Sequence, residues 1–218
     1  MELTWLGQSC VRIEKDGTVL VIDPGLAAPA HALDDADAVL ITHEHSDHLA
    51  IPLLMSAVRT RRHLKIWTNR SVANLLEGTG ARVHQVDDGD TFDVMGIPIS
   101  VHGSWHGQVH HEIPPVRNVG FLVDSTLFHP GDALTDPATP VGALLLPLCG
   151  RWVPRVGKLL DYVRQVRPQR VIPVHDTGAA PINLQVHASF LSKDPIPNAT
   201  PGTGAPYTPL TTLEPTTL

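Results

Sequence analysis

The sequence predicts an α+β fold, a four-layer sandwich in which two β-sheets pack face to face and helices cover both outer faces. Two observations lead to this prediction. Short apolar runs typical of strands come first in an antiparallel meander and then alternate with segments of helical periodicity. Hydrophobic residues also make up 42% of the 218 residues, which is enough for the core of a single domain spanning residues 1–218.

The first part of the chain contains three expected strands joined by tight turns. Residues 3–6, 10–14 and 18–22 are rich in strand-forming residues, and Asp16-Gly17 favours a hairpin between the last two. Residues 38–42 are apolar without alternation, which is typical of a buried strand. The other elements expected in this part are helices at residues 51–61 and 71–77, with a strand at residues 65–68 between them.

The later part of the chain contains further strands and one clear helix face. Leu159, Leu160, Val163 and Val166 have the spacing of one side of a helix. A final helix is expected at residues 181–191. The expected strands are residues 82–86, 91–94, 97–102, 119–123, 126–129, 143–147 and 170–174.

The composition of the last residues and the net charge of the chain limit the expected structure and partners further. Residues 192–218 are rich in Pro and Thr, so they form either a loose tail or an edge strand at residues 207–210. A formal net charge of −6 argues against nucleic acid or anionic lipid as a partner. No run is long enough to span a bilayer and the N-terminus lacks a signal-peptide pattern. We therefore expect a cytoplasmic protein that acts on a small molecule, and the oligomeric state stays open.

The densest chemical signal is the stretch THEHSDH at residues 42–48, directly after a buried strand. Crowded titratable groups are unfavourable unless a cation lies among them. An extended backbone points His43 and His45 to the same side, whereas Asp47 and His48 follow in the turn that opens the next helix. One segment thus offers ligands to two centres. Imidazole and carboxylate suit zinc, with manganese and iron(II) as alternatives.

The HxHxDH pattern, followed in order by His106, Asp132 and His175, resembles that of the metallo-β-lactamase superfamily of metal-dependent hydrolases. The resemblance covers about residues 1–180. It implies an αββα fold with the site at one edge of the two sheets. It also implies that His106 completes the first metal site, that Asp132 bridges both metals and that His175 completes the second. Asp23 matches a structural position of the family. The narrower branch that includes ascorbate-phosphate lactonases and N-acyl-phosphatidylethanolamine phospholipases is the most similar.

The third ligand of the first metal has two candidates. His102 ends a strand, whereas His106 stands in a Gly-flanked loop just beyond it, where ligands are usually delivered, so His106 is favoured. His110 and His111 then become groups that orient ligands or donate protons, or they belong to a surface loop. His129 is expected to be a buried structural histidine.

The resemblance implies a hydrolytic mechanism with two metal ions about 3.5–4 Å apart. A hydroxide shared between them would attack the carbonyl carbon of an ester or lactone, or the phosphorus of a phosphodiester. Asp47 would orient this nucleophile as well as bind metal, and His110 or His111 would protonate the leaving group. Two other functions fit the same sequence: a non-catalytic member of the fold that binds a metal or ligand, and a di-iron redox protein.

Residues 148–152 follow an expected strand and should overhang the site. In this region Arg151, with Arg155, would hold an anionic group of the substrate, and Trp152 or Trp105 would pack on an apolar part. Surface arginines beside a packing tryptophan fit the pattern equally well. The identity of the substrate therefore does not follow from the sequence.

Overall fold

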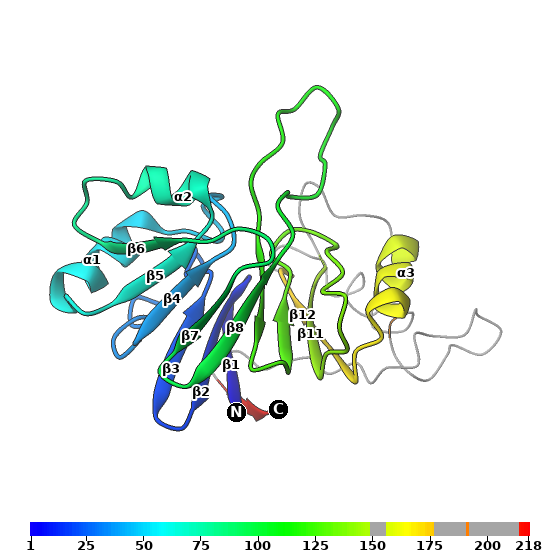
Figure 1. Ribbon diagram of the computed structural model, residues 1–218, viewed down its shortest axis with the longest axis horizontal. Coiled ribbons are helices and arrows are strands. Elements are labelled where there is room, and N and C mark those ends of the chain that lie inside the picture. Colours follow the sequence, from blue (N-terminus) through cyan, green and yellow to red (C-terminus); the bar gives the residue numbers. More distant parts are fainter. Residues whose placement is uncertain (149–155, 177–190, 192–213) are drawn as a thin grey trace.

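The computed structural model describes residues 1–148, 156–176, 191 and 214–218. Two sheets lie face to face at the centre of the molecule, with helices on the outside of each (Figure 1). No helix within the described residues is long and apolar enough to cross a membrane. The helix expected at residues 181–191 and the edge strand expected at 207–210 lie outside the described residues, apart from Leu191.

The first sheet has seven strands within the described residues, in the order β13-β1-β2-β3-β4-β5-β6. Neighbouring strands from β13 to β3 pair antiparallel, and those from β3 to β6 pair parallel. The short apolar run of β4 is buried at all of its positions, as expected for a central parallel strand. The bounds are β1 (Glu2–Gly7), β2 (Cys10–Lys15), β3 (Thr18–Ile22), β4 (Ala38–Ile41), β5 (Lys65–Thr68), β6 (Arg82–Gln85) and β13 (Pro215–Thr217).

The second sheet has six strands within the described residues, in the order β12-β11-β10-β9-β8-β7. Strands β7 to β10 pair antiparallel, and β10, β11 and β12 pair parallel. Strands β8, β10 and β12 consequently run in the same direction, so their carboxyl ends meet at one edge of the sheet. The bounds are β7 (Thr91–Val94), β8 (Ile97–His102), β9 (Gly120–Val123), β10 (Leu127–His129), β11 (Ala143–Pro147) and β12 (Arg170–Val174).

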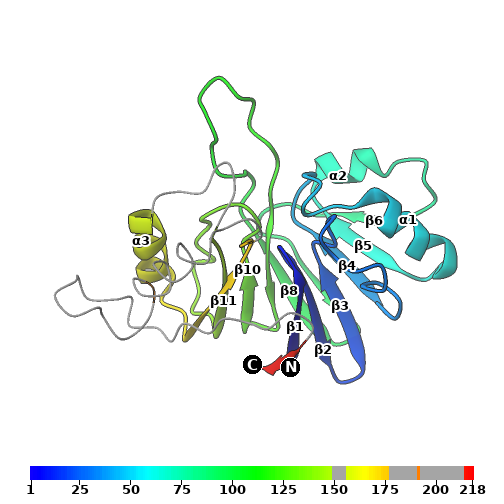
Figure 2. The ribbon, with the colours of Figure 1, turned by 180° about the vertical axis from the view of Figure 1, so that it is seen from behind.

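Three apolar layers hold these elements together. The inner layer lies between the sheets and combines residues such as Leu20 and Phe121 from opposite sheets. The other two layers join each sheet to its helices: α1 (Ile51–Thr60) and α2 (Arg70–Leu75) cover the first sheet, and α3 (Val156–Val166) covers the second (Figures 1 and 2). The αββα sandwich expected from the sequence is therefore confirmed.

The last described residues form an edge strand rather than a loose tail. Strand β13 pairs antiparallel with β1, with Thr216 opposite Leu3, and places the two chain ends side by side (Figure 2). The sequence analysis considered an edge strand only at residues 207–210, and Pro215–Thr217 lie further along the chain. A Pro at the start of a strand is compatible with an edge position because it has no N–H to donate.

Helix α2 begins one residue earlier than expected because Asn69 caps it. The Asn69 side-chain oxygen accepts hydrogen bonds from the backbone N–H groups of Ser71 and Val72, at 2.8 and 3.2 Å. Its amide nitrogen donates to the carbonyl oxygen of Thr42 at 2.8 Å. Asn69 thereby fastens the start of α2 to the end of β4, immediately before the histidine-rich segment.

Replacing Asn69 tests this link. Asn69→Ala removes both the cap and the bond to Thr42, and we expect it to lower the free energy of unfolding by about 1–2 kcal/mol. Asn69→Ser keeps an oxygen acceptor for the cap and loses only the amide donor to Thr42, so its loss should be smaller. Denaturant unfolding measures both values, and equal losses would contradict the double role.

Candidate metal centre

The histidines and aspartates singled out in the sequence lie at one edge of the two sheets. His43, His45, Asp47 and His48 follow β4 in the first sheet. The other three residues follow strands of the second sheet that share one direction: His106 comes after β8, Asp132 after β10 and His175 after β12. The packing of the two sheets therefore brings together donors from four separate segments.

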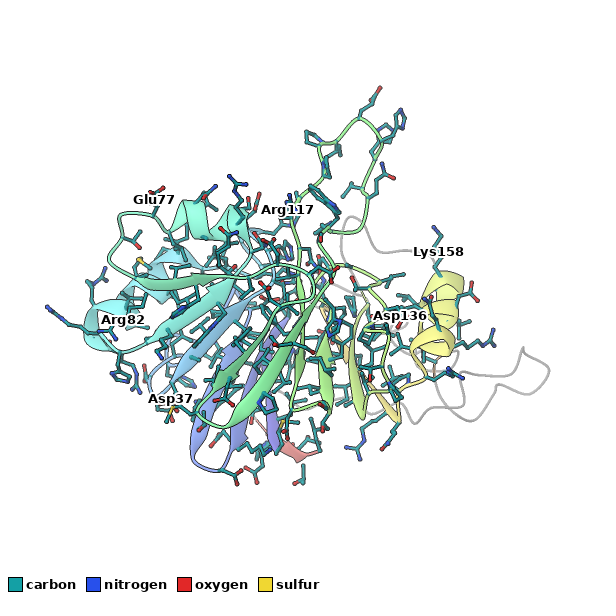
Figure 3. The ribbon with its side chains drawn as sticks, in the orientation of Figure 1. Asp37, Glu77, Arg82, Arg117, Asp136 and Lys158 are labelled. Atoms are coloured by element: carbon teal, nitrogen blue, oxygen red, sulfur yellow. The ribbon has the colours of Figure 1, made fainter. Side chains whose placement is uncertain are left out.

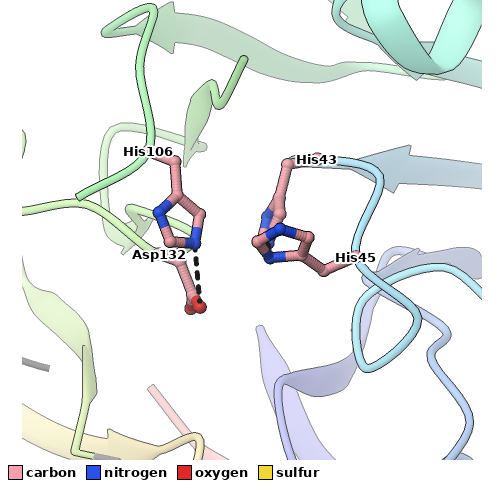
Figure 4. A group of neighbouring side chains, drawn as sticks. All are labelled: His43, His45, His106 and Asp132. Atoms are coloured by element: carbon pink, nitrogen blue, oxygen red, sulfur yellow. Dashed lines mark hydrogen bonds and ion pairs between the residues drawn. The ribbon is translucent and has the colours of Figure 1, made fainter. Parts of the chain in front are cut away.

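The first group of donors consists of three imidazoles and one carboxylate. His43, His45, His106 and Asp132 each offer one ligand atom, and these atoms lie within 4.8 Å of one another. His43 Nε2 lies 3.0 Å from His45 Nδ1, and His106 Nε2 lies 3.4 Å from Asp132 Oδ2. Figure 4 shows His43 and His45 facing His106 and Asp132.

The second group of donors lies beside the first. Asp47, His48 and His175 also offer ligand atoms within 4.8 Å of one another. His175 Nε2 lies 3.1 Å from Asp47 Oδ2. The ring centroids of His48 and His43 are 4.0 Å apart, so the two groups are in direct contact.

The carboxylate of Asp132 reaches both groups. Its Oδ2 lies 3.4 Å from His106 Nε2 in the first group and 3.3 Å from His175 Nε2 in the second. Its Oδ1 lies 3.2 Å from His48 Nε2. One side chain thus occupies the position from which a carboxylate can serve two centres at once.

Hydrogen bonds fix the orientation of the rings. His48 Nδ1 lies 2.7 Å from Asp23 Oδ2, and His106 Nδ1 lies 2.6 Å from the carbonyl oxygen of Gly107. His43 Nδ1 lies 3.0 Å from Thr42 Oγ1. In each ring the Nε2 atom is left to face the interior of the site. Outer contacts of this kind are typical of metal-binding histidines.

The histidines divide into two electrostatic types. Burial, followed by the charge of His48, lowers the pKa of His43 well below its usual value. Burial also lowers the pKa of His45, with His106 as the next cause. Burial opposes the charging of His48 and His175 as well, but there the carboxylates outweigh it. Asp132 and Asp23 raise the pKa of His48 to about 10, and Asp132 and Asp47 raise that of His175 to about 9.

This electrostatic pattern fits a bound metal. Asp132 is 2% exposed and Asp23 is fully buried, and a buried carboxylate requires positive charge nearby. Protons on His48 and His175 meet that requirement in the metal-free protein. A divalent cation supplies the same charge to neutral imidazoles, which is the form that binds metal. The donor set is also of the nitrogen and oxygen type that zinc, manganese and iron(II) accept.

Comparisons with known proteins identify the family to which the chain belongs. Residues 2–175 match the family model described as a beta-lactamase superfamily domain. Protein Rv0786c of Mycobacterium tuberculosis is 31% identical over 187 residues, which cover 83% of this chain and 86% of that protein. A UPF0173 metal-dependent hydrolase of Carboxydothermus hydrogenoformans is 27% identical, over 80% of this chain and 84% of its own. The chain belongs to the metallo-β-lactamase superfamily of metal-dependent hydrolases.

A solved structure of another protein has the same fold. Igni18, described as a novel metallo hydrolase from the archaeon Ignicoccus hospitalis, aligns with a TM-score of 0.70. The alignment covers 99% of this chain and 97% of that one at 20% sequence identity. The family and the fold expected from the sequence are therefore both confirmed.

Asp23 and Thr42 support the HxHxDH motif through hydrogen bonds. Asp23 Oδ1 accepts a hydrogen bond from the backbone N–H of Thr42, and Oδ2 accepts one from the Thr42 hydroxyl, both at 2.7 Å. The same Oδ2 contacts His48. Asp23 therefore fixes both the start of the motif and one of its rings, in line with the structural role that the resemblance implies.

Asn118 is a supporting residue that the sequence analysis missed. Its Oδ1 accepts a hydrogen bond from the backbone N–H of Asp132 at 3.0 Å, and its Nδ2 donates to the carbonyl oxygen of Pro130 at 2.9 Å. Gly131 has a φ of +63°, and a Cβ there would overlap Asn118 Oδ1. The glycine in the sequence Pro130-Gly131-Asp132 hints at this tight turn, but no pattern marks Asn118.

The structure separates the two candidates for the third ligand. His106 lies in the first donor group, whereas His102 lies at the end of β8 and contacts Ser100 Oγ at 2.8 Å and the ring of Phe128. His129 is buried, lies 3.0 Å from the carbonyl oxygen of Ser9 through its Nε2, and accepts the backbone N–H of Gly131 at its Nδ1. Its contacts are those of a structural histidine.

The other predicted site residues do not join the donor groups. The loop of residues 103–119 projects from the molecule (Figure 3). His110 and His111 are exposed on it, with tilted rings whose centroids lie 4.1 Å apart. Trp105 is 49% exposed and its ring packs against the Arg117 guanidinium at 4.2 Å, at the base of that loop. Arg151, Trp152 and Arg155 lie outside the described residues.

Gly25 packs so closely against the candidate metal-binding segment that it leaves no room for a side chain. A Cβ on Gly25 would overlap the backbone oxygen of Asp47. We expect Gly25→Ala to lower the free energy of unfolding by about 1–3 kcal/mol, as in other overpacked positions, and to displace Asp47.

Gly157→Ala in helix α3 is the matched control, because a Cβ placed there meets no atom of the described residues within 4 Å beyond its chain neighbours and the backbone of its own helix. It should leave the unfolding midpoint unchanged or raise it. Thermal unfolding compares the two variants, and equal midpoints would contradict the close packing of Gly25.

Proposed function

We propose that this protein is a dinuclear metal-dependent hydrolase that acts on an ester, a lactone or a phosphodiester. The observation that carries the proposal is the pair of adjacent donor groups that share the carboxylate of Asp132. Zinc is the preferred metal because imidazoles dominate both groups, and manganese and iron(II) are the alternatives. When bound, two such cations make water nucleophilic at neutral pH and stabilise negative charge on the substrate oxygen.

Asp47 is the residue best placed to orient the attacking water. The hydrogen bond from His175 holds the pKa of the Asp47 carboxyl well below its usual range, so the group is charged at neutral pH. Asp47 is also half-buried, whereas His48 beside it is fully buried. A charged carboxylate on the accessible side of the site accepts a hydrogen bond from water and fixes its direction of attack.

Exposure indicates where a substrate reaches the site. His43, His48, His106, Asp132 and His175 are all buried, and His45 and Asp47 are the half-buried members of the two groups. The accessible side is therefore that of His45 and Asp47, and it fits a small-molecule substrate. An anionic group on that substrate stays a proposal that rests on Arg151 in the sequence.

Protonation of the leaving group by His110 or His111 stays a prediction from the sequence. Both rings are exposed and His110 Nδ1 lies 3.7 Å from Glu112 Oε2 on the same loop. The role requires the loop of residues 103–119 to place these rings beside a bound substrate.

Metal analysis joined to a hydrolase panel tests the proposal. We expect about two equivalents of metal per chain after expression with zinc, and hydrolysis of at least one of p-nitrophenyl esters, lactones and bis-p-nitrophenyl phosphate. Removal of metal by a chelator should abolish turnover, and added zinc should restore it.

Other outcomes would point elsewhere. Metal-free protein after zinc-replete expression would contradict the proposal and favour a non-catalytic binding protein. Two bound iron ions with redox activity and without hydrolysis would contradict it in favour of a di-iron protein.

Asp132→Asn tests the shared carboxylate. The change keeps the size of the side chain and removes its charge, so we expect loss of at least one of the two cations together with most of the turnover. Asp124→Asn is a suitable control, because Asp124 pairs with Lys15 outside the donor groups. Elemental analysis and steady-state kinetics measure both effects. Unchanged activity with both metals retained would refute the bridging role of Asp132.

A further inference from the structure

Gln8 stands next to the second donor group in a strained backbone conformation. It lies between β1 and β2 with a φ of +53°, a left-handed value that is uncommon for residues other than glycine. Its side chain is buried, with 7% exposure. Strained residues cluster at functional sites, where the surrounding structure holds them in place.

The backbone of Gln8 is fixed from two directions. Its carbonyl oxygen accepts a hydrogen bond from Trp5 Nε1 at 2.8 Å and another from the backbone N–H of His175 at 2.9 Å. His175 itself has a φ of +56°. Two strained residues from the two sheets are therefore joined by one hydrogen bond at the edge of the site.

The side chain of Gln8 reaches two members of the second donor group. Its Nε2 donates to Asp47 Oδ2 at 3.3 Å and lies 3.2 and 3.3 Å from the ring nitrogens of His175. The Asp47 oxygen that it contacts is the one that His175 Nε2 also approaches. The amide thus lies against the pair of ligand atoms.

We propose that Gln8 is a positioning residue that holds Asp47 and His175 ready to take the second cation. This inference rests on the proposed dinuclear function. Asp47 is half-buried in a turn, and besides Gln8 its carboxylate contacts only His175 among the donor groups, so the loss of the amide would leave it freer to turn toward water. A neutral amide restrains the carboxylate by a hydrogen bond. An Arg or Lys at this position would carry a positive charge and would compete with the cation for the carboxylate.

The length of the side chain explains why glutamine occupies this strained position. Glycine or asparagine would adopt the left-handed backbone more readily. Glycine has no side chain to offer, and the amide of asparagine is one methylene shorter. The backbone strain at residue 8 is thus tolerated for a contact that needs the full length of glutamine.

Cobalt(II) titration of the metal-free protein, followed by visible absorption, tests the proposal through metal binding itself. Gln8→Met keeps the length of the side chain and removes its N–H groups. Gln85→Met is the matched control, because Gln85 Nε2 also donates to an aspartate, Asp87 Oδ2, at 3.3 Å, but on the exposed strand β6. Asp47→Asn identifies the titration step that belongs to the second group.

We expect two titration steps in the parent protein. Gln8→Met should weaken the step that Asp47→Asn affects by roughly 10–100-fold and leave the other step unchanged. On a substrate from the hydrolase panel, kcat should fall by a similar factor while KM stays the same. Gln85→Met should titrate and turn over like the parent.

Gln8→Asn distinguishes the effect of backbone strain from that of side-chain length. It also replaces Gln8→Met in the titration if Gln8→Met does not fold. It suits the left-handed backbone, so its unfolding midpoint should equal or exceed that of the parent, yet its short amide should weaken the same titration step. A parent with two steps and Gln8 variants that titrate identically would overturn the role of Gln8 alone. A parent without two steps would overturn the dinuclear proposal together with it.

Discussion

The buried negative charge of Asp132 is the constraint on which the arrangement of this edge of the molecule depends. A carboxylate with 2% exposure is costly unless positive charge and hydrogen bonds surround it. His48, His106 and His175 approach its two oxygens from three different segments. Asp23 is a second buried carboxylate, and its oxygens contact His48 and the start of the histidine-rich segment. The charges form a connected network rather than a set of separate pairs.

The topology supplies what this network needs. Strands β8, β10 and β12 share one direction, so the residues that follow them meet at one end of the second sheet. Strand β4 delivers its histidines to the same edge from the opposite sheet. Polar turns such as Pro130-Gly131-Asp132 then aim individual side chains inward, and Asn118 secures that turn.

Much of this arrangement could be predicted from the sequence, because it depends on patterns among residues that are close together in the chain. The apolar run of β4 marks a buried strand, and the spacing of residues 42–48 allows two sets of ligands from one segment. His106 was separable from His102 because a glycine turn follows the strand end, and Gly103 does have a φ of +80°. These features depend on neighbours in the chain, which a sequence displays directly.

The parts that could not be predicted depend on contacts between distant residues. Gln8 meets Asp47 from 39 positions away and His175 from 167 positions away, and no spacing rule links them. Asn118 acts on a turn that lies 14 positions later in the chain. The edge strand β13 is equally non-local. Its Pro and Thr residues show no strand pattern in the sequence, and they form a strand only by pairing with β1.

The origin of the donors in both sheets has a consequence for folding. Segments separated by more than a hundred residues must be in place before the complete site exists, so a cation that uses the complete site would bind the native state more tightly than the unfolded chain. By mass action, such an occupant shifts the folding equilibrium toward the native form as its concentration rises. A cation held by donors from both sheets would also oppose any opening motion that separates one sheet from the other.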